Sequence, residues 1–580
     1  MAFERVALDH FAPTFGTAIE LSSVALGGRV ESCSDEFFAE SFHLLLVEPP
    51  PSLKGQFGPK GALYSGWETR RHNPAYDWCI LKLGTTGTIF GFDIDTTHFN
   101  GNEAPEVSVD ALYRPDDQVA PLADNANWAE TLPRVPLAPN SRHLFKIAPT
   151  DGINYVKLNM YPDGGIARFR VYGLVSPVFP ASLDTQLDLA HVFSGGRVVF
   201  TSDQHFGVGA NLILPGRGKD MGDGWETKRS RQKGHKDWAI IKLGDAGYLS
   251  HAEIDTAHYK GNFPESCELH ALASEKLNPS EVSEDQWTLI LPRTKLGPHR
   301  QHYFQLENVD GIAFTHVRVT IYPDGGIKRV RIIGRRAGGD NTAPSVSNAA
   351  GDPTPTVPQE AFAIASPVVG SEQSSTKPTG PVIPALPLTP EAFAPFGQVV
   401  QAYDDVNAVS SPRATRITGA NQGTAVKFHK LALLESSYPT EAGATAGLSV
   451  YRCKPIDVGS TGLWEVKLLE RHACTNQAFI PMGAGETLNN PGQTYLVIVA
   501  LNGPDDAPNL QSLRAFIATS GQGIVYNTGI WHHPMAVIDR TIDFTCVETQ
   551  VGNGDKLDCE IVDLDGSVGY HTVQLPSKVL

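Results

Sequence analysis

The sequence has little of what membrane, secreted or zinc-ribbon proteins require. Its seven cysteines are scattered and no two are spaced as C-x-x-C, which disfavours a disulfide framework and a zinc ribbon. No apolar run approaches the length of a membrane span. The first residues lack a signal-peptide pattern and the last lack S-K-L, so we expect a cytoplasmic protein rather than a peroxisomal one. The formal net charge of −16 disfavours general attraction to nucleic acid.

What the chain does contain is an internal duplication. GGRVESCSDEFF (27–38) is matched by GGRVVFTSDQHF (195–206), and GFDIDTTHFNGN (91–102) is matched by HAEIDTAHYKGN (251–262). The second copy of the latter motif begins 160 residues after the first. This period is far longer than that of a solenoid repeat, so we predict two homologous domains.

The duplicated half has the pattern of β-structure. In VRVTIY (317–322) and IKRVRIIG (327–334), apolar and polar residues alternate with period two. Pro-Asp-Gly-Gly joins the two runs, and this turn chemistry predicts a hairpin. Similar runs recur between closely spaced turn residues, which favours two antiparallel sandwiches of the jelly-roll type.

A change of composition follows the duplication. A stretch rich in Pro, Ser, Thr, Gly and Ala predicts a disordered linker, and a third folded unit begins near LTPEAFAPFG (388–397). TYLVIVAL, LRAFIAT and TIDFTCVE read as strands, so this unit is predicted to be a small β-barrel. The predicted boundaries are 1–178 and 179–336 for the two copies, 337–385 for the linker and 386–580 for the barrel.

Both copies keep a set of tryptophans and polar side chains. Each residue alone has a structural explanation, because tryptophans pack cores, Glu–Arg pairs hold strands and Asp suits turns. Together, the repeated Glu, Asp, His, Asn and Arg are the groups that bind a carboxylate and move protons. The repeated set is Trp67/Trp225, Glu68/Glu226, Arg71/Arg229, Asp95/Asp255, His98/His258, Asn102/Asn262, Arg134/Arg293, His143/His302 and Arg168/Arg329.

In order, GWETRR, DWCILKLG, DIDTTHFNGN and YPDGGIARFRVYG resemble allantoicase, and the resemblance covers about residues 15–335. It implies two galactose-binding-like jelly rolls that convert allantoate and water to ureidoglycolate and urea. The reaction needs a carboxylate clamp, an acid for the departing urea and a base. The catalytic candidates are Glu68, Glu226, His98, His258 and Asp223. The substrate-binding candidates are Trp225, Arg71, Arg229, Asp255, Asn102, Asn262, Arg134, Arg293, His302 and Arg329.

One difference between the copies favours the second. Asp223 stands where the first copy has Ser65, so the second copy is complete if this carboxylate is catalytic. One composite site, or a purely structural first copy, stays open as an alternative.

The third unit carries its own cluster of polar residues. On a strand, Glu470 and His472 point to the same face, whereas His532 and His533 point to opposite faces. An E-x-H strand meeting a later histidine inside a barrel resembles a cupin site, which often holds a metal. The three-histidine-and-glutamate pattern is missing, so the sequence leaves open a divalent metal at Glu470, His472 and His532. A structural alternative pairs Glu470 with Arg471 or Arg514.

These stretches, with NQGTAVKFHKLA (421–432), resemble ureidoglycolate lyase over about residues 385–575. The resemblance implies cleavage of ureidoglycolate to glyoxylate and urea. Glu470, His472 and one of His532 and His533 are the acid–base candidates, and Gln477 and Asn421 are candidates to hold the ureido group.

The two resemblances fall on consecutive reactions, so we predict a bifunctional enzyme of ureide breakdown. The alternatives are that one half is inactive, or that the jelly rolls and the cupin-like domain bind ligands without catalysis. The expected partners are allantoate, ureidoglycolate and further copies of the same chain, with neither nucleic acid nor a membrane.

Overall fold

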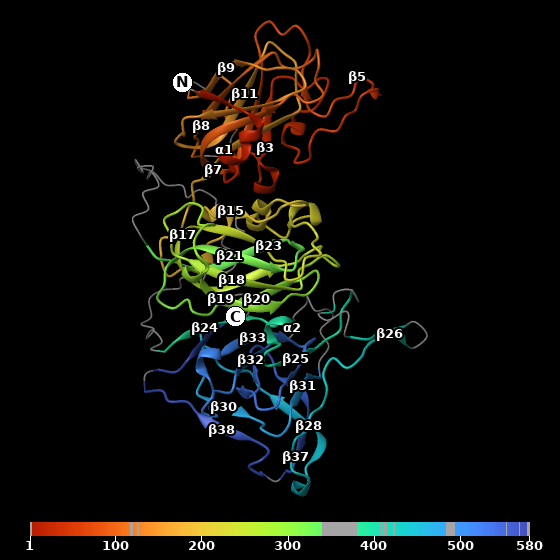
Figure 1. The fold of residues 1–580 in the computed structure, drawn as a ribbon, viewed down its shortest axis with the longest axis vertical. Helices are drawn as coiled ribbons and strands as arrows, with labels where there is room; N and C mark the ends of the chain where they lie inside the picture. The colour runs from red at the N-terminus through yellow and green to blue at the C-terminus, as the bar shows by residue number, and fades with distance from the viewer. Residues whose placement is uncertain are drawn as a thin grey trace.

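The structure is a computed structural model in which three β-rich domains follow one another in a row (Figure 1). It describes residues 3–115, 120–124, 127–338, 380–405, 409, 415–420, 424–482, 494–552, 554–567 and 569–576. The predicted linker lies mostly outside these residues, and β24 (Val382–Pro387) begins within its last positions. Within the described ranges, no helix is long and apolar enough to cross a membrane.

The first domain is an antiparallel sandwich built around one long strand. β7 (Asp77–Asp95) pairs with β3 and β11 along its first part and with β10 and β13 along its last part. One continuous strand therefore takes part in both layers. The other elements are β1 (Phe3–Val6), α1 (Phe11–Phe15), β2 (Ile19–Glu20), β3 (Arg29–Cys33), β4 (Phe57–Gly58), β5 (Gly61–Ala62), β6 (Trp67–Glu68), β8 (Glu106–Leu112), β9 (Ala129–Pro136), β10 (Arg142–Ile147), β11 (Gly152–Tyr161), β12 (Gly165–Ile166) and β13 (Arg168–Val175).

The second domain repeats this plan, with β17 (Asp237–Asp255) as its long strand. The predicted hairpin over 317–334 is wrong, because β21 and β23 pair with opposite ends of β17 and not with each other. The other elements are β14 (Leu187–Asp188), β15 (Arg197–Thr201), β16 (Trp225–Glu226), β18 (Ser266–Leu272), β19 (Thr288–Lys295), β20 (Gln301–Gln305), β21 (Phe314–Tyr322), β22 (Gly326–Ile327) and β23 (Arg329–Arg336).

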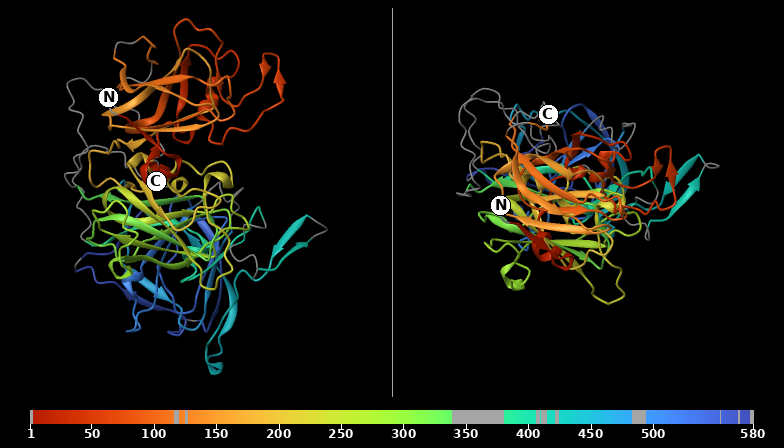
Figure 2. Two further views of the ribbon diagram at one scale, coloured as in Figure 1. Left: turned by 45° about the horizontal axis from the view of Figure 1, so that its top comes forward. Right: turned by 90° about the horizontal axis from the view of Figure 1, so that it is seen from above.

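The third domain is formed by two curled sheets that face each other as a barrel. The larger sheet has the order β29-β39-β24-β33-β32-β35-β30-β38, with β36 beside β32, and the smaller has the order β25-β34-β31-β37-β28. Phe393, Phe516, Tyr526 and Phe544 are among the residues that fill the space between them. The hairpin β26–β27 projects from the body of the domain (Figure 2).

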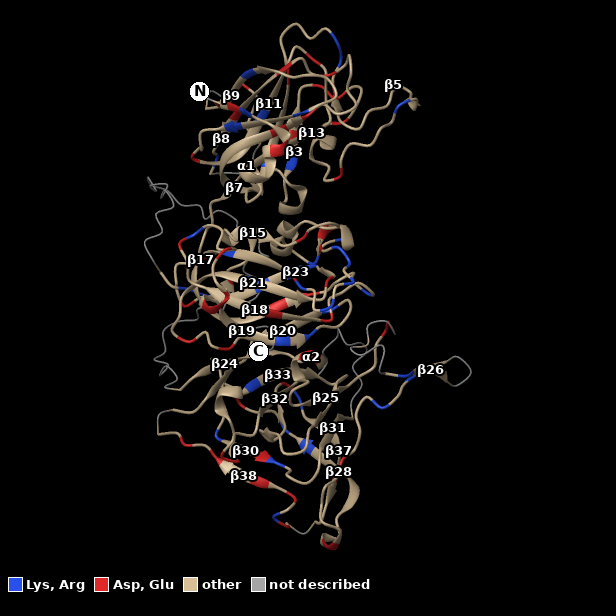
Figure 3. Cartoon of the chain, in the orientation of Figure 1, with Lys and Arg blue, Asp and Glu red and all other residues tan. Residues whose placement is uncertain are grey.

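The bounds of the elements not yet given are α2 (Pro390–Phe393), β25 (Gly397–Val400), β26 (Ile417–Ala420), β27 (Ala425–Phe428), β28 (Thr445–Cys453), β29 (Leu463–Glu465), β30 (Leu468–Arg471), β31 (Gln477–Pro481), β32 (Thr494–Ala500), β33 (Arg514–Thr519), β34 (Gly523–Tyr526), β35 (Trp531–His532), β36 (Ala536–Val537), β37 (Ile542–Gln550), β38 (Glu560–Asp563) and β39 (Thr572–Gln574). The predicted fold class is confirmed: the chain is mostly β, with two jelly-roll sandwiches and a cupin-like barrel. Acidic and basic residues are interspersed along the chain in all three domains (Figure 3).

Candidate active sites

The long strand of each sandwich ends at an aspartate that the two copies share. Asp95 is the last residue of β7 and Asp255 is the last residue of β17, and a histidine follows each three positions later. His98 and His258 both have a left-handed backbone, with φ of 70° and 69°. Such a conformation is uncommon for a residue other than glycine and is found at functional sites more often than elsewhere.

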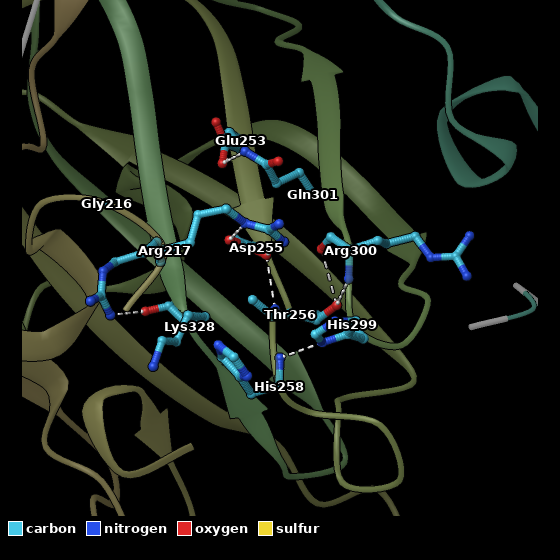
Figure 4. Close-up of polar contacts among 12 residues, drawn as sticks. Gly216, Arg217, Glu253, Asp255, Thr256, His258, His299, Arg300, Gln301 and Lys328 are labelled. Atoms are coloured by element: carbon cyan, nitrogen blue, oxygen red, sulfur yellow. Dashed lines mark hydrogen bonds and ion pairs between the residues drawn. The ribbon is translucent and has the colours of Figure 1, made fainter. Parts of the chain in front are cut away.

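In the second domain, these residues belong to a polar cluster (Figure 4). Arg217 donates two hydrogen bonds to Asp255, of 2.7 and 2.9 Å. The backbone N–H of His258 donates to Nδ1 of His299 at 2.7 Å, and Gln301 donates to Glu253 at 2.8 Å. We call Arg217, Glu253, Asp255, His258, His299 and Gln301 the second-domain cluster.

The cluster combines a buried carboxylate with a reachable cation. The Asp255 side chain is 0% exposed, whereas that of Arg217 is 48% exposed. The hydrogen bonds that Arg217 donates to Asp255 raise the pKa of Arg217, so the guanidinium stays charged. Burial raises the pKa of Glu253 and lowers the pKa of His299, so a neutral His299 ring accepts the His258 N–H.

The first domain has the same framework with different contacts. The backbone N–H of His98 donates to the side-chain oxygen of Asn140 at 2.8 Å, and Nε2 of its ring lies 3.1 Å from the carbonyl oxygen of Pro50. Arg170 donates to the Leu46 carbonyl, and Arg331 donates to the equivalent Leu214 carbonyl, just before the loop that carries Arg217 in the second domain. The first copy has prolines there (Pro49–Pro51) and no arginine.

Arg217 is a residue that the sequence analysis missed. It has no counterpart in the first copy, so a comparison of the two copies could not find it. The available signal was its setting, because Gly216 and Gly218 flank it and both have positive φ. Two such glycines allow the turns that bring Arg217 to Asp255.

Several predicted residues form a second group in both copies. Asn262 donates to Glu226 at 2.6 Å, and Asn102 donates to Glu68 at 3.0 Å. Arg71 lies 3.1 Å from Asp163 and 3.8 Å from Glu68, and burial raises the pKa of Glu68. Arg229 lies 3.8 Å from Asp324.

Asp223 has a partner that explains its difference from Ser65. The ammonium group of Lys328 contacts the Asp223 carboxylate, and the Lys328 side chain is 0% exposed. The first copy has Ala167 at the position of Lys328. The Ser/Asp difference therefore occurs together with an Ala/Lys difference that the sequence analysis did not notice.

Other predicted substrate-binding residues make contacts within the protein. Trp225 and His302 are fully buried, and their contact with substrate stays a prediction. The Trp225 indole donates to the Asp203 carbonyl, and His302 accepts the Gly297 N–H at 2.7 Å. Three arginines have structural partners: Arg329 binds the Asp223 carbonyl, Arg134 pairs with Glu106 on β8, and Arg293 pairs with Glu265 just before β18.

The third domain brings Glu470, His472 and His532 together. Glu470 on β30 lies directly across from His532 on β35, and His472 follows the end of β30. Their ligand atoms all lie within 4.8 Å of one another, with His532 Nε2 3.6 Å from Glu470 Oε1. We call these three residues the E/H/H group.

The E/H/H group consists of three hydrogen-bond acceptors. Nδ1 of His472 lies 2.6 Å from the Asp558 carbonyl and Nδ1 of His532 lies 3.1 Å from the Ile530 carbonyl. Carbonyls only accept, so each Nδ1 carries the proton and each Nε2 presents a lone pair. Burial lowers the pKa of His532 to about 3, which keeps its ring neutral. Burial, followed by the nearby Glu548 charge, raises the pKa of Glu470 to about 7.

The group opens into a pocket of about 290 Å³. Gln477 and Glu548 line it from the smaller sheet, and Gln477 donates to Glu548 at 2.9 Å. His533 lies elsewhere, with its ring edge against Trp464. Asn421 lies outside the described residues. The structural alternative for Glu470 fails, because Arg471 binds Asp506 and Glu560 while Arg514 binds Glu307.

Comparisons with known proteins agree with this division. The family described as Allantoicase repeat matches residues 19–176 and 187–337, and the family described as Ureidoglycolate lyase matches 380–569. A probable allantoicase of Schizosaccharomyces pombe is 52% identical over 58% of this chain and 98% of its own length. An allantoicase of Saccharomyces cerevisiae is 43% identical over 55% of this chain and 94% of its own length.

A solved structure extends the similarity to the fold. The crystal structure of allantoicase from Saccharomyces cerevisiae is 39% identical, with a TM-score of 0.51, and covers 57% of this chain and 100% of that one. These matches disfavour the alternative of non-catalytic binding modules. The chain belongs to the allantoicase family over its two jelly-roll domains and carries a ureidoglycolate lyase domain behind them, which makes it a bifunctional enzyme of ureide breakdown.

Proposed function

We propose that allantoate is hydrolysed at the second-domain cluster, and that Arg217 and His258 act on the substrate. The observation that carries this proposal is the pairing of an accessible arginine with a histidine held in a left-handed conformation. The first domain has the histidine, but Pro49 stands at the position of Arg217, and its accessible Arg142 pairs with Asp93 instead. The second domain is thus favoured for a reason other than Asp223.

The chemistry assigns a role to each residue. Two of the Arg217 nitrogens bind Asp255, which leaves Nη1 for the carboxylate of allantoate. In the reaction, the departing urea nitrogen gains a proton and the water loses one. A single imidazole near the reacting carbon can both give and take a proton, and the exposed side of the His258 ring is suited to this. Glu226, fixed by Asn262, is the second proton carrier.

The duplication supplies a matched test. His258→Ala should lower the kcat for loss of allantoate by at least about 100-fold, as expected for a general acid–base group. His98→Ala should change kcat by less than threefold. Glyoxylate release from supplied ureidoglycolate reports folding of the same protein. The reverse ranking of the two variants would place the reaction in the first domain.

For the lyase domain, we propose a divalent metal held by the E/H/H group. Two imidazole Nε2 atoms and one carboxylate face each other, and both imidazoles are oriented by backbone carbonyls, as metal ligands usually are. The substrate is an anion, yet the described residues lining the pocket include Glu548 and Asp558 and neither lysine nor arginine. A cation would therefore balance the charge in this pocket. When bound, it would attract the substrate carboxylate and polarise the hydroxyl oxygen.

The remaining pocket residues supply the proton transfer. Cleavage moves the hydroxyl proton of ureidoglycolate to the departing urea nitrogen as the carbonyl of glyoxylate forms. Glu548, oriented by the Gln477 amide, lies in the pocket to take this proton from the oxygen and deliver it to the nitrogen. The side-chain oxygen of Gln477 is buried without a hydrogen-bond partner among the described residues and suits a ureido N–H.

Two substitutions separate these roles. Glu470→Gln should lose both bound metal and glyoxylate release, whereas Glu548→Gln should keep the metal and lose kcat by about 100-fold. His533→Ala is the matched control for His532→Ala, because only His532 belongs to the E/H/H group. A metal-free protein with full activity would contradict the metal site. Cytoplasmic location and homo-oligomer formation stay predictions, the latter open to light scattering.

A further inference from the structure

The second allantoicase domain and the lyase domain meet at a buried carboxylate. Glu391 lies in the short helix α2 of the lyase domain, and Thr389 caps that helix through the Ala392 N–H. The Glu391 side chain points into the second domain and is 3% exposed. Its oxygens lie 3.5 Å from Arg300 and 4.0 Å from His302.

Two more ion pairs cross the same interface. Lys260 pairs with Asp405 at 2.7 Å, and Arg514 of the lyase domain pairs with Glu307 at 2.8 Å. Arg300 also stacks over the ring of Tyr403, 5.4 Å from its centroid. The contact is therefore specific and joins named groups on both sides.

The duplication acts as an internal control for this surface. The second copy has Lys260, Gly297, Arg300 and Glu307 where the first copy has Asn100, Ala138, Ser141 and Ala148. A side chain on Gly297 would place its Cβ 2.4 Å from a Glu391 oxygen, so the Glu391 carboxylate would have to shift to make room for it. The second domain thus has the four residues that contact the lyase domain, and the first domain has other residues at these positions.

The receiving loop is also part of the second-domain cluster. Arg300 lies between His299, which accepts the His258 N–H, and Gln301, which binds Glu253 (Figure 4). The hydroxyl of Thr256, next to Asp255, donates to the Gly297 carbonyl at 2.7 Å. A shift of residues 297–302 would therefore move His299, which accepts from His258, and Gln301, which donates to Glu253.

We propose that Glu391 is a positioning residue for allantoate hydrolysis, through which the docked lyase domain holds the 297–302 loop in place. This inference rests on the proposed location of that reaction in the second domain. Without Glu391, the Arg300 guanidinium, 14% exposed, loses its buried counter-charge and turns toward water. His299 and Gln301 move with it. Small misplacements of groups around a reacting centre are costly to rate.

The test uses the full chain and measures both reactions in each variant. Glu391→Ala should lower the kcat for allantoate about tenfold with a smaller change in KM, and leave glyoxylate release from ureidoglycolate within twofold. If Glu391→Ala perturbs the lyase domain, Glu391→Gln replaces it as the test. Glu391→Gln keeps the side-chain volume and should show the same loss of kcat for allantoate. Arg514→Gln is the matched control, because it breaks an ion pair of the same interface that does not involve the 297–302 loop.

Arg300→Ser introduces the residue of the first copy and completes the test. The double variant Glu391→Gln/Arg300→Ser should be no slower than the slower single variant, because both remove one interaction. Wild-type allantoate turnover in both Glu391→Ala and Glu391→Gln, together with a large loss in His258→Ala, would overturn the role of Glu391 and leave the reaction in the second domain. Full activity of His258→Ala would instead contradict the location of the reaction in the second domain.

Discussion

Replacing Asp223 by the serine of the first copy tests whether that carboxylate serves chemistry or charge balance. Lys328 is buried and its ammonium group contacts Asp223 and the Asp220 carbonyl, so Asp223→Ser removes the carboxylate and leaves the carbonyl. Burial already lowers the pKa of Lys328 to about 8. The lysine can therefore release its proton, which at pH 7 costs about 1.4 kcal/mol. The expected destabilisation is therefore about 1–2 kcal/mol.

The partner substitution should restore most of this loss. Lys328→Ala leaves the Asp223 side chain, 37% exposed, in contact with water, so we expect a cost of about 1–2 kcal/mol. The double variant Asp223→Ser/Lys328→Ala reproduces the Ser65/Ala167 pair of the first copy and should be about 1 kcal/mol more stable than Asp223→Ser. Calorimetry of the second-domain transition measures this, at about 2–4 °C per kcal/mol for a domain of this size.

The same variants decide the role of Asp223 in the reaction. We expect allantoate turnover in the double variant to stay within about tenfold of wild type, because Arg217 and His258 are untouched. A loss of more than about 100-fold in Asp223→Ser with an unchanged melting temperature would refute the charge-balance explanation. It would also restore Asp223 as a catalytic residue.

Three further predictions concern the clamp, the metal and acid stability. Arg217→Met should raise the KM for allantoate at least tenfold, measured by steady-state kinetics, and an unchanged KM would exclude Arg217 as the clamp. Dialysis against chelator should abolish glyoxylate release, return it on adding divalent cation and spare allantoate loss; loss of both activities would count against separate sites. Burial lowers the pKa of His251 to about 4, so its contribution to stability is full above about pH 6.5 and is lost as pH falls toward 4. In pH-dependent melting, His251→Leu should remove about 3 kcal/mol of the stability that is lost between pH 6.5 and pH 4. An unchanged loss would mean that His251 keeps its ordinary pKa in the folded domain.

The fold class was readable because strand patterns are local, whereas strand partners are not. The runs at 317–322 and 327–334 do form β21 and β23, but the turn between them does not pair them. Both strands find longer partners in the 19 residues of β17. Turn chemistry reports the direction of the chain at one point and carries no information on a strand 80 residues away.

The sites divide in the same way. Glu470 and His472 could be predicted as neighbours because two residues on one strand share a face. Glu548 and Asp558 come from later segments, and their place in the pocket depends on how the two sheets close. Arg217 was invisible to a comparison of the two copies, since the first copy has no equivalent. Repetition identified the shared framework and left out the residue that differs.

The differences between the two copies carry more functional information than their similarities. Shared residues such as Trp67 and Trp225 are fully buried and maintain the sandwich in both domains. The changed positions gather in two places of the second domain: beside the cluster, at Arg217 and Lys328, and on the surface that receives Glu391. The 297–302 loop belongs to both places, because Arg300 faces the lyase domain while its neighbours His299 and Gln301 contact the cluster. Substitutions that make the second copy resemble the first should therefore affect allantoate turnover even where they touch neither substrate nor cluster.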